Sequence, residues 1–258
     1  MPVLARPGGS ISYQVTGGGY PPLLLTHGYG ASGAMFGHNL AAASAQNQVV
    51  TWDIRGHGSS ESPAETGHYS ADAALGDMAA LLAELDLDRA VLGGHSLGGY
   101  LSLDFALRNP GQVAGLVLIG TGPGFRNDAA RDDWNRRAHK TAARLEERGL
   151  AALGGSSELQ GQHGDADGLA RAARHTLTQR DSHVIDGLPS IRVPTLVIVG
   201  AEDAPFQAAA DYMTAKLPRA RKVVIAAAGH APNVDQPEQF NAELRAFLDE
   251  VAAAEQAA

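Results

Sequence analysis

The chain has 258 residues, which is enough for one α/β domain with a sizeable hydrophobic core. It contains no cysteine, which excludes disulfide bonds and thiolate metal sites, and its formal net charge of −8 argues against nucleic acid or an anionic membrane as a partner. No stretch approaches the roughly 18 consecutive apolar residues of a membrane span. Because no signal peptide is evident either, we expect a cytoplasmic protein.

Strands and helices are predicted to alternate along most of the chain, which is typical of a mostly parallel sheet covered by helices on both faces. The segment Ser10–Val15 alternates apolar and polar residues, as an edge or antiparallel strand does. Short apolar runs predict further strands, buried on both sides, at Leu23–Thr26, Val49–Trp52, Val91–Gly93, Leu116–Ile119, Leu196–Val199 and Val223–Ile225. Apolar residues at helical spacing predict helices over Ala73–Leu85, Leu97–Leu107 and Pro237–Ala253.

A candidate nucleophile follows the predicted strand Val91–Gly93. The residues Gly94-His95-Ser96-Leu97-Gly98 form the pattern G-x-S-x-G at the start of a predicted helix. Small residues on both sides of a serine permit a sharp strand-to-helix turn that exposes its hydroxyl. The alternative is a glycine-rich turn with an incidental serine. We predict that Ser96 is a nucleophile, which requires a neighbouring base.

An acid and a histidine follow two later strands. Asp203 comes shortly after the run that ends at Val199, and His230 shortly after the run that ends at Ile225. Because the carboxyl ends of parallel strands converge on one edge of a sheet, we expect these two side chains to meet Ser96 there. As the acid, Glu202 is the near alternative and Asp128 a more remote one.

Taken together, four segments in this order resemble the α/β-hydrolase family along nearly the whole chain. They are His27-Gly28-Tyr29-Gly30, Asp53-Ile54-Arg55-Gly56-His57-Gly58-Ser59-Ser60, Gly94 to Gly99, and Gly229-His230-Ala231-Pro232 with Asp235-Gln236-Pro237. The resemblance implies an α/β-hydrolase fold, with a mostly parallel eight-stranded sheet and a helical cap inserted after the sixth strand. We expect residues 1–121 and 190–258 to form the core and residues 122–189 the cap, in which helical patterns lie near Asp128–Arg148 and Asp165–Arg180.

The resemblance also implies a role for each site residue. Ser96 would attack an acyl carbon, His230 would act as general base, and Asp203 would orient the imidazole. The backbone N–H groups of Tyr29 and Leu97 would form the oxyanion hole. A serine here, where relatives that open epoxides or remove halides usually carry aspartate, indicates acyl transfer. His27, Asp53, Arg55 and His57 are expected to organise loops by hydrogen bonding.

The pocket is expected to be mainly apolar, with Met35, Phe36, Phe125 and Trp134 lining it. Trp134 could equally pack the cap onto the core. The charged residues of the predicted helix Asp128–Arg148, Arg137 among them, are interpreted as a solvated face. No cofactor is expected. A metal site is not expected either, because Asp53 and His57 have no third ligand at suitable spacing.

The sequence therefore predicts a serine hydrolase that cleaves small to medium, mainly apolar carboxylic esters through an acyl-Ser96 intermediate, as a monomer or homodimer. A lactonase of the enol-lactone type and a carbon–carbon bond hydrolase remain open, as does a ligand-binding protein on a hydrolase scaffold. Residues Gly28 to Gly33 also match G-x-G-x-x-G, and Asp53 closes the next strand. A dinucleotide-binding oxidoreductase is therefore a remote alternative.

Overall fold

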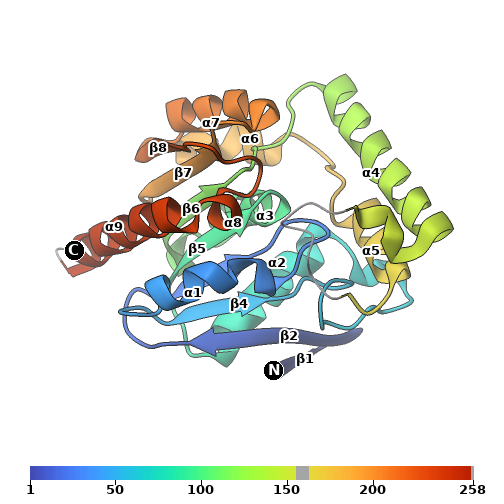
Figure 1. The fold of residues 1–258 in the computed structure, drawn as a ribbon, viewed down its shortest axis with the longest axis horizontal. Coiled ribbons are helices and arrows are strands. Elements are labelled where there is room, and N and C mark those ends of the chain that lie inside the picture. The colour runs from blue at the N-terminus through green and yellow to red at the C-terminus, as the bar shows by residue number, and fades with distance from the viewer. Residues whose placement is uncertain (155–162, 257–258) are drawn as a thin grey trace.

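The computed structural model describes residues 1–154 and 163–256; residues 155–162, inside the predicted cap, lie outside the described part. Figure 1 shows a central sheet with helices on both sides. Its strands lie in the order β1-β2-β4-β3-β5-β6-β7-β8. β1 pairs antiparallel with β2, and β2 antiparallel with β4, whereas all other neighbours are parallel. The strands are β1 (Val3–Arg6), β2 (Gly9–Thr16), β3 (Leu23–Thr26), β4 (Val49–Trp52), β5 (Ala90–His95), β6 (Val113–Ile119), β7 (Thr195–Gly200) and β8 (Ala220–Ile225).

Helices bury both faces of this sheet. On one face, apolar side chains such as Leu24 and Leu92 pack with α2 (Ala71–Glu84), α3 (Leu97–Arg108) and α7 (Ala204–Lys216). On the other face, Leu23 and Leu25 pack with α1 (Gly37–Ala43) and α9 (Pro237–Gln256). Successive strand residues point to opposite faces, so a continuous apolar run fills both layers. Short elements connect these parts: α8 (Pro232–Asp235) and the 3-10 helices η1 (Gly33–Phe36), η2 (Thr66–His68) and η3 (Pro110–Gln112).

The predicted sheet and its flanking helices are confirmed, with shifts of a few residues at some ends. One strand was not expected. β1 has a short sequence, Val-Leu-Ala-Arg, without polar alternation, and it pairs with β2 at the outer edge of the sheet. Because backbone hydrogen bonds to β2 hold this strand while its side chains stay partly exposed, no apolar pattern in the sequence marks it.

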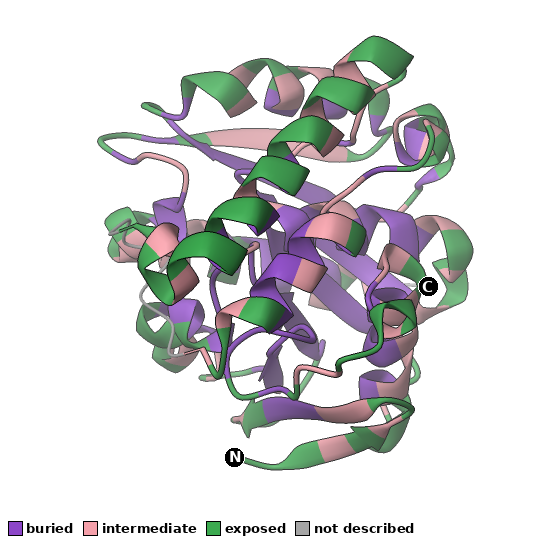
Figure 2. Ribbon diagram, turned by 90° about the vertical axis from the view of Figure 1, so that its right-hand side faces the viewer, coloured by how far each residue is buried: buried purple, intermediate pink, exposed green. Residues whose placement is uncertain are grey.

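The helical cap follows β6. It contains α4 (Asp128–Arg148), the 3-10 helix η4 (Gly149–Leu153) and α5 (Ala166–His175), which Figure 1 shows grouped together at one side of the sheet. α4 and α5 share a small apolar cluster of their own, to which Leu145 and Leu169 belong. Figure 2 shows α4 in front of the buried strands, with most of its outer surface exposed. The second cap helix ends at His175, earlier than the sequence predicts.

The last part of segment 122–189 returns to the core. It forms α6 (His183–Gly187), which is followed by the 3-10 helix η6 (Leu188–Ser190). Val184 and Leu188 are buried in the same apolar cluster as residues of α3. The division of the chain into a core and a cap stays a prediction, and these contacts tie the end of the segment to the core. Among the described residues, no helix is both long and apolar enough to cross a membrane.

A buried ionic cluster fastens the antiparallel edge of the sheet to α2. The Asp77 carboxylate, on α2, accepts hydrogen bonds from Arg55 Nε at 2.7 Å and Arg55 Nη2 at 2.8 Å. Arg6 Nε, at the end of β1, donates to the same carboxylate at 2.9 Å. Arg55 also donates to the Pro7 carbonyl at 2.7 Å. The expectation that Arg55 organises a loop is confirmed, but its partner Asp77 was not predicted because it is distant in sequence.

We expect Asp77→Ala to lower the free energy of unfolding by about 3 kcal/mol, because it leaves the buried Arg55 guanidinium without its counter-ion. Urea denaturation followed by circular dichroism measures this change. Asp88→Ala, which removes an exposed carboxylate after the same helix, is the control and should change stability by less than about 0.5 kcal/mol. Equal small effects of the two substitutions would contradict a structural role for the cluster.

Candidate active site

Ser96 occupies a strained turn between β5 and α3. Its φ is 49° and its ψ is −110°, a conformation that a residue with a Cβ rarely adopts. Two hydrogen bonds hold it there. The Ser96 N–H donates to the Ile119 carbonyl at 2.9 Å, and the Thr121 hydroxyl donates to the Ser96 carbonyl at 2.6 Å. Strain of this kind persists only where the surroundings enforce it, and it is concentrated at functional sites.

Glycines beside the turn allow neighbouring segments to approach closely. A Cβ on Gly98 would lie 2.1 Å from the Thr26 carbonyl oxygen, so α3 could not meet the end of β3 with a larger residue there. A Cβ on Gly28 would lie 2.4 Å from His95 Nδ1 and 3.3 Å from Ser96 Cβ. The loop after β3 is thus held directly against Ser96.

The backbone N–H groups of Tyr29 and Leu97 flank this contact. Tyr29 directly follows Gly28, and Leu97 is the first residue of α3, where the N–H has no partner inside the helix. Within the part of the chain that the structure describes, neither group donates a backbone hydrogen bond. The Tyr29 hydroxyl reaches the cap, where it donates to the Leu169 carbonyl at 2.9 Å.

His230 and Asp203 are brought together as predicted. His230 Nδ1 lies 2.8 Å from Asp203 Oδ2, and the Asp203 side chain is buried. Asp203 follows β7, and His230 follows β8, so both come from the carboxyl ends of neighbouring parallel strands. Glu202 is exposed, and Asp128 pairs with Arg131 on α4. Of the three carboxylates considered, Asp203 is the one that contacts the imidazole.

Two residues that the sequence did not single out surround His230. The His95 ring centroid lies 4.7 Å from that of His230, and His95 Nε2 donates to the His230 carbonyl at 3.0 Å. The Phe206 ring, at the start of α7, lies 4.6 Å from the His230 ring. His95 adjoins Ser96 in sequence, but only the folded sheet places its ring on the loop that carries His230.

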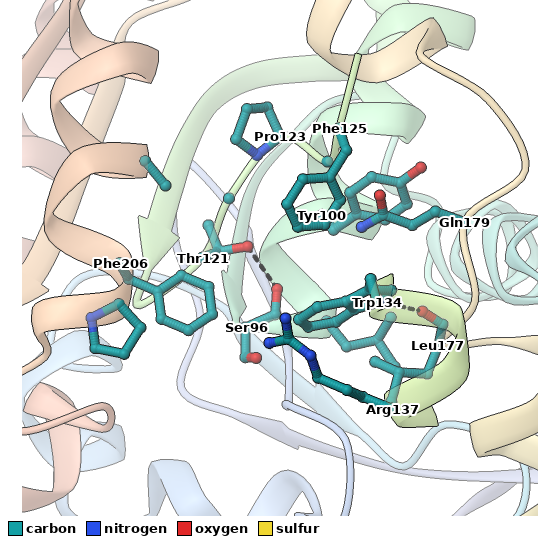
Figure 3. Close-up of a pocket in the computed structure, with 15 residues that line it drawn as sticks. Ser96, Tyr100, Thr121, Pro123, Phe125, Trp134, Arg137, Leu177, Gln179 and Phe206 are labelled. Carbon is teal, nitrogen blue, oxygen red and sulfur yellow. Dashed lines mark hydrogen bonds between the residues drawn. The ribbon is translucent and has the colours of Figure 1, made fainter. Parts of the chain in front are cut away.

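A cavity of about 370 Å³ opens at Ser96 and is partly covered by residues of the cap (Figure 3). Most of its walls are apolar. The residues that line it are Ser96, Leu97, Tyr100, Thr121, Gly122, Pro123, Gly124, Phe125, Trp134, Arg137, Leu177, Gln179, Pro205, Phe206 and Ala209. Phe125 and Trp134 therefore lie where the pocket prediction places them. Trp134 also donates from Nε1 to the Leu177 carbonyl at 2.9 Å, which fixes its ring.

The pocket prediction is wrong for Met35 and Phe36. Both are buried in the apolar cluster between the sheet and α9, and neither lines the cavity. They follow the loop at Tyr29 closely in sequence, but η1 turns them under the sheet, where their large apolar side chains fill the core.

The expected loop-organising role of His27, Asp53 and His57 is confirmed. His27 Nδ1 lies 2.7 Å from the Gly28 carbonyl, and its Nε2 accepts from the Ile54 N–H at 2.9 Å. Asp53 accepts from the N–H groups of Gly33 and Ser59 at 2.7 and 2.8 Å. His57 Nδ1 lies 3.1 Å from the Arg55 carbonyl.

A cap residue completes this arrangement of loops. His163 Nε2 lies 2.9 Å from the Gly30 carbonyl, and its Nδ1 accepts from the Gly58 N–H at 3.0 Å. His163 thus ties the cap to both loops. In the sequence it is one of several scattered histidines, and nothing in its neighbourhood distinguishes it.

Comparison with known proteins agrees with this geometry. Residues 23–243 match the alpha/beta hydrolase family, which is most of the chain. The chain belongs to that family. It is 33% identical over 262 residues to a pimeloyl-[acyl-carrier protein] methyl ester esterase of Aromatoleum aromaticum, which covers 84% of this chain and 94% of that one.

Solved structures of esterases and lactonases have the same fold. A thermophilic esterase from Thermogutta terrifontis superimposes with a TM-score of 0.80 at 28% identity, covering 96% of this chain and 97% of that one. The enol-lactonase from Burkholderia xenovorans LB400 gives a TM-score of 0.78 at 25% identity, covering 96% and 100%. The resemblance inferred from the motifs is therefore confirmed.

Membership in this family leaves the dinucleotide-binding alternative without support. Gly28 is packed against His95, and both Asp53 carboxylate oxygens already accept hydrogen bonds from the loop backbone. That carboxylate is thus used within the fold rather than presented to a ribose.

Burial keeps several histidines of the site region neutral. It lowers the pKa of His27 to about 4, although the bond to Gly28 opposes the shift, and it lowers the pKa of His95 to about 3. Burial, together with the nearby His27, also lowers the pKa of His57. If one of these rings became charged, its second N–H group would be buried without a hydrogen-bond acceptor, so the charged form is disfavoured.

We expect the free energy of unfolding to decrease as the pH falls from about 6.5 to about 5. In this range the histidines of the unfolded chain, with a pKa of about 6.5, bind protons, whereas the buried rings of the folded protein stay neutral. The contribution of these buried histidines to the free energy of unfolding is complete at pH values above about 6.5. Urea denaturation at a series of pH values measures the slope. His27→Gln should flatten it, the exposed His38→Gln should not, and a pH-independent wild type would contradict the interpretation.

Proposed function

We propose that this protein is a carboxylic ester hydrolase that works through an acyl-Ser96 intermediate. The observation that carries the proposal is the placement of a half-buried serine in a strained turn, beside the cavity and on the same edge of the sheet as a hydrogen-bonded His230–Asp203 pair. A hydroxyl becomes nucleophilic only beside a base, and a base works best when a carboxylate fixes its tautomer. The family and its esterase members support this assignment.

In the proposed reaction, Ser96 Oγ attacks the ester carbonyl carbon while its proton passes to His230 Nε2. The contact between His230 Nδ1 and Asp203 keeps the proton on Nδ1, leaves Nε2 free to accept, and stabilises the imidazolium that forms. When the tetrahedral intermediate collapses, the C–O bond to the alcohol breaks, and His230 returns the proton to the leaving oxygen. Water then attacks the acyl-enzyme by the same route, which releases the acid and restores Ser96.

The oxyanion of the tetrahedral intermediate would be bound by the backbone N–H groups of Tyr29 and Leu97. Their position beside Ser96 and their lack of other acceptors among the described residues support this role. Fixed backbone donors need no reorganisation during the reaction, and each typically lowers the barrier by about 3 kcal/mol.

The cavity favours substrates of small to medium size with a substantial apolar part. Its volume of about 370 Å³ and its walls of Phe125, Trp134, Leu177 and Phe206 support this substrate class. A lactonase is the second candidate, because a lactone is an internal ester, and the similar fold of an enol-lactonase supports it. In that case the leaving alcohol stays attached to the acyl group.

Hydrolysis of p-nitrophenyl esters from acetate to decanoate, with Ser96→Ala as the control, tests the proposal. We expect activity at one or more chain lengths that disappears in the variant, together with labelling of Ser96 by a fluorophosphonate, which needs an activated serine. An enzyme that neither cleaves an ester nor reacts with the probe would favour a binding protein. Labelling without ester cleavage would direct the search to lactones and carbon–carbon bonds.

The choice of acid is tested by a pair of neighbouring substitutions. Asp203→Asn should lower kcat by about 10³- to 10⁴-fold, because the amide favours the wrong imidazole tautomer while it preserves the side-chain shape. Glu202→Gln, one residue earlier on the exposed side of the same loop, should leave kcat close to that of the wild type. Steady-state kinetics with the best ester distinguish them. A large effect of Glu202→Gln with a small effect of Asp203→Asn would reverse the assignment.

A further inference from the structure

Among the described residues that line the cavity beside Ser96, one is charged, Arg137. Its side chain extends from α4 into the cavity, as Figure 3 shows. None of the described residues that line the cavity carries a carboxylate, so these walls offer the guanidinium no counter-ion. Arg137 is exposed, so its charge stays in contact with solvent, and a cation beside the cavity and near the proposed nucleophile can select a substrate by charge.

Arg137 differs in this respect from its neighbours on α4. Arg131 pairs with Asp128, and Arg136 pairs with Asp133, each across one turn of the helix. Among the residues that the structure describes, Arg137 makes no ion pair and no side-chain hydrogen bond. The sequence interpretation of this helix as a solvated face therefore fits Arg136, whereas the Arg131 side chain is only 14% exposed and also donates to the Phe125 carbonyl. Arg137 lines the cavity, and its donors have no partner among the described residues.

A second polar side chain of the cap is also without a partner. Asn135 fixes the backbone of Gln179 from both sides, since its Oδ1 accepts from the Gln179 N–H at 2.8 Å and its Nδ2 donates to the Gln179 carbonyl at 2.9 Å. The Gln179 carboxamide lines the cavity, and its Oε1 is buried with no hydrogen bond among the described residues. A buried amide group without a hydrogen-bond partner lowers the stability of the fold, unless a bound molecule supplies that partner.

We propose that the preferred substrate is an ester that carries a carboxylate, which Arg137 binds as a counter-ion while the Gln179 carboxamide donates to an oxygen of the same molecule through its Nε2. The inference rests on the proposed function and narrows it, because it adds an anionic group to the apolar substrate class. A guanidinium matches a carboxylate with two parallel hydrogen bonds. The apolar walls would hold the carbon chain between the carboxylate and the ester.

Charge selectivity is measured with matched pairs of methyl esters. Monomethyl succinate, glutarate and adipate are each compared with the methyl ester of the corresponding monoamide, which has nearly the same shape but no charge. The readout is the ratio of kcat/KM for acid and amide, followed by release of methanol. A ratio cancels effects of a substitution on folding or on the catalytic residues, since both substrates use the same chemistry.

We expect the wild-type enzyme to prefer the acid at one or more of the three lengths. Arg137→Gln should lower this preference about tenfold, the value typical of one charge-assisted contact at a partly solvated site. Arg137→Lys should keep part of it. Arg136→Gln is the matched control, because it removes a cation from the adjacent position of the same helix, outside the cavity, and should keep the full preference.

Two results would overturn the inference: a wild type that cleaves none of the acids faster than its amide, or an Arg137→Gln variant that keeps the wild-type ratio. Failure of the inference about a carboxylate-bearing substrate can be distinguished from failure of the proposed esterase function. If Ser96 reacts with the fluorophosphonate and neutral p-nitrophenyl esters are cleaved, only the preference for a carboxylate is lost. If the probe leaves Ser96 unlabelled and all esters resist cleavage, the esterase proposal fails first.

Discussion

The close approach of α3 to the end of β3 is the constraint on which the site depends. Because Gly98 lies against the Thr26 carbonyl, the chain must leave β5 and enter α3 within a single residue, and that residue is Ser96. The turn is strained, and hydrogen bonds from Ser96 to Ile119 and from Thr121 to Ser96 tie it to β6 on the other side. A side chain held in this way is pre-organised before any substrate binds, which is the condition under which position contributes to catalysis.

The electrostatics of the site divide its histidines into two groups. His27, His57 and His95 are buried, their pKa values are lowered, and they serve as neutral hydrogen-bonding groups that shape loops. His230 instead combines partial exposure with a buried carboxylate partner, so a positive charge on its ring would be compensated. Burial disfavours the charged form of a histidine, and an adjacent carboxylate favours it. The contact with Asp203 is what distinguishes His230 from these three histidines, and it supports the proposed role in proton transfer.

The segment after β6 contributes about half of the described residues that line the cavity. Trp134 and Arg137 come from α4, Leu177 and Gln179 from the segment after α5, and the core supplies Ser96 itself. Contacts of Tyr29 with Leu169, and of His163 with Gly30 and Gly58, couple the cap to the loops beside the nucleophile. The proposed nucleophile and the proposed selectivity residue Arg137 thus lie on different parts of the chain, as is common where inserted segments cover a rigid scaffold.

The sequence by itself determined the family, most strands and helices, and the proposed triad, because each depends on local signals: continuous apolar runs, small residues around a serine, and polar residues directly after strands. The edge strand β1, the Asp77 cluster and the place of Met35 and Phe36 could not be predicted, since they depend on contacts between segments far apart in the chain. Helical periodicity shows that a face is polar, but not what lies opposite it. Only the tertiary structure decided that Arg137 lines the cavity while the adjacent Arg136 does not, because the direction of a side chain on the cap is set by how α4 packs over Ser96.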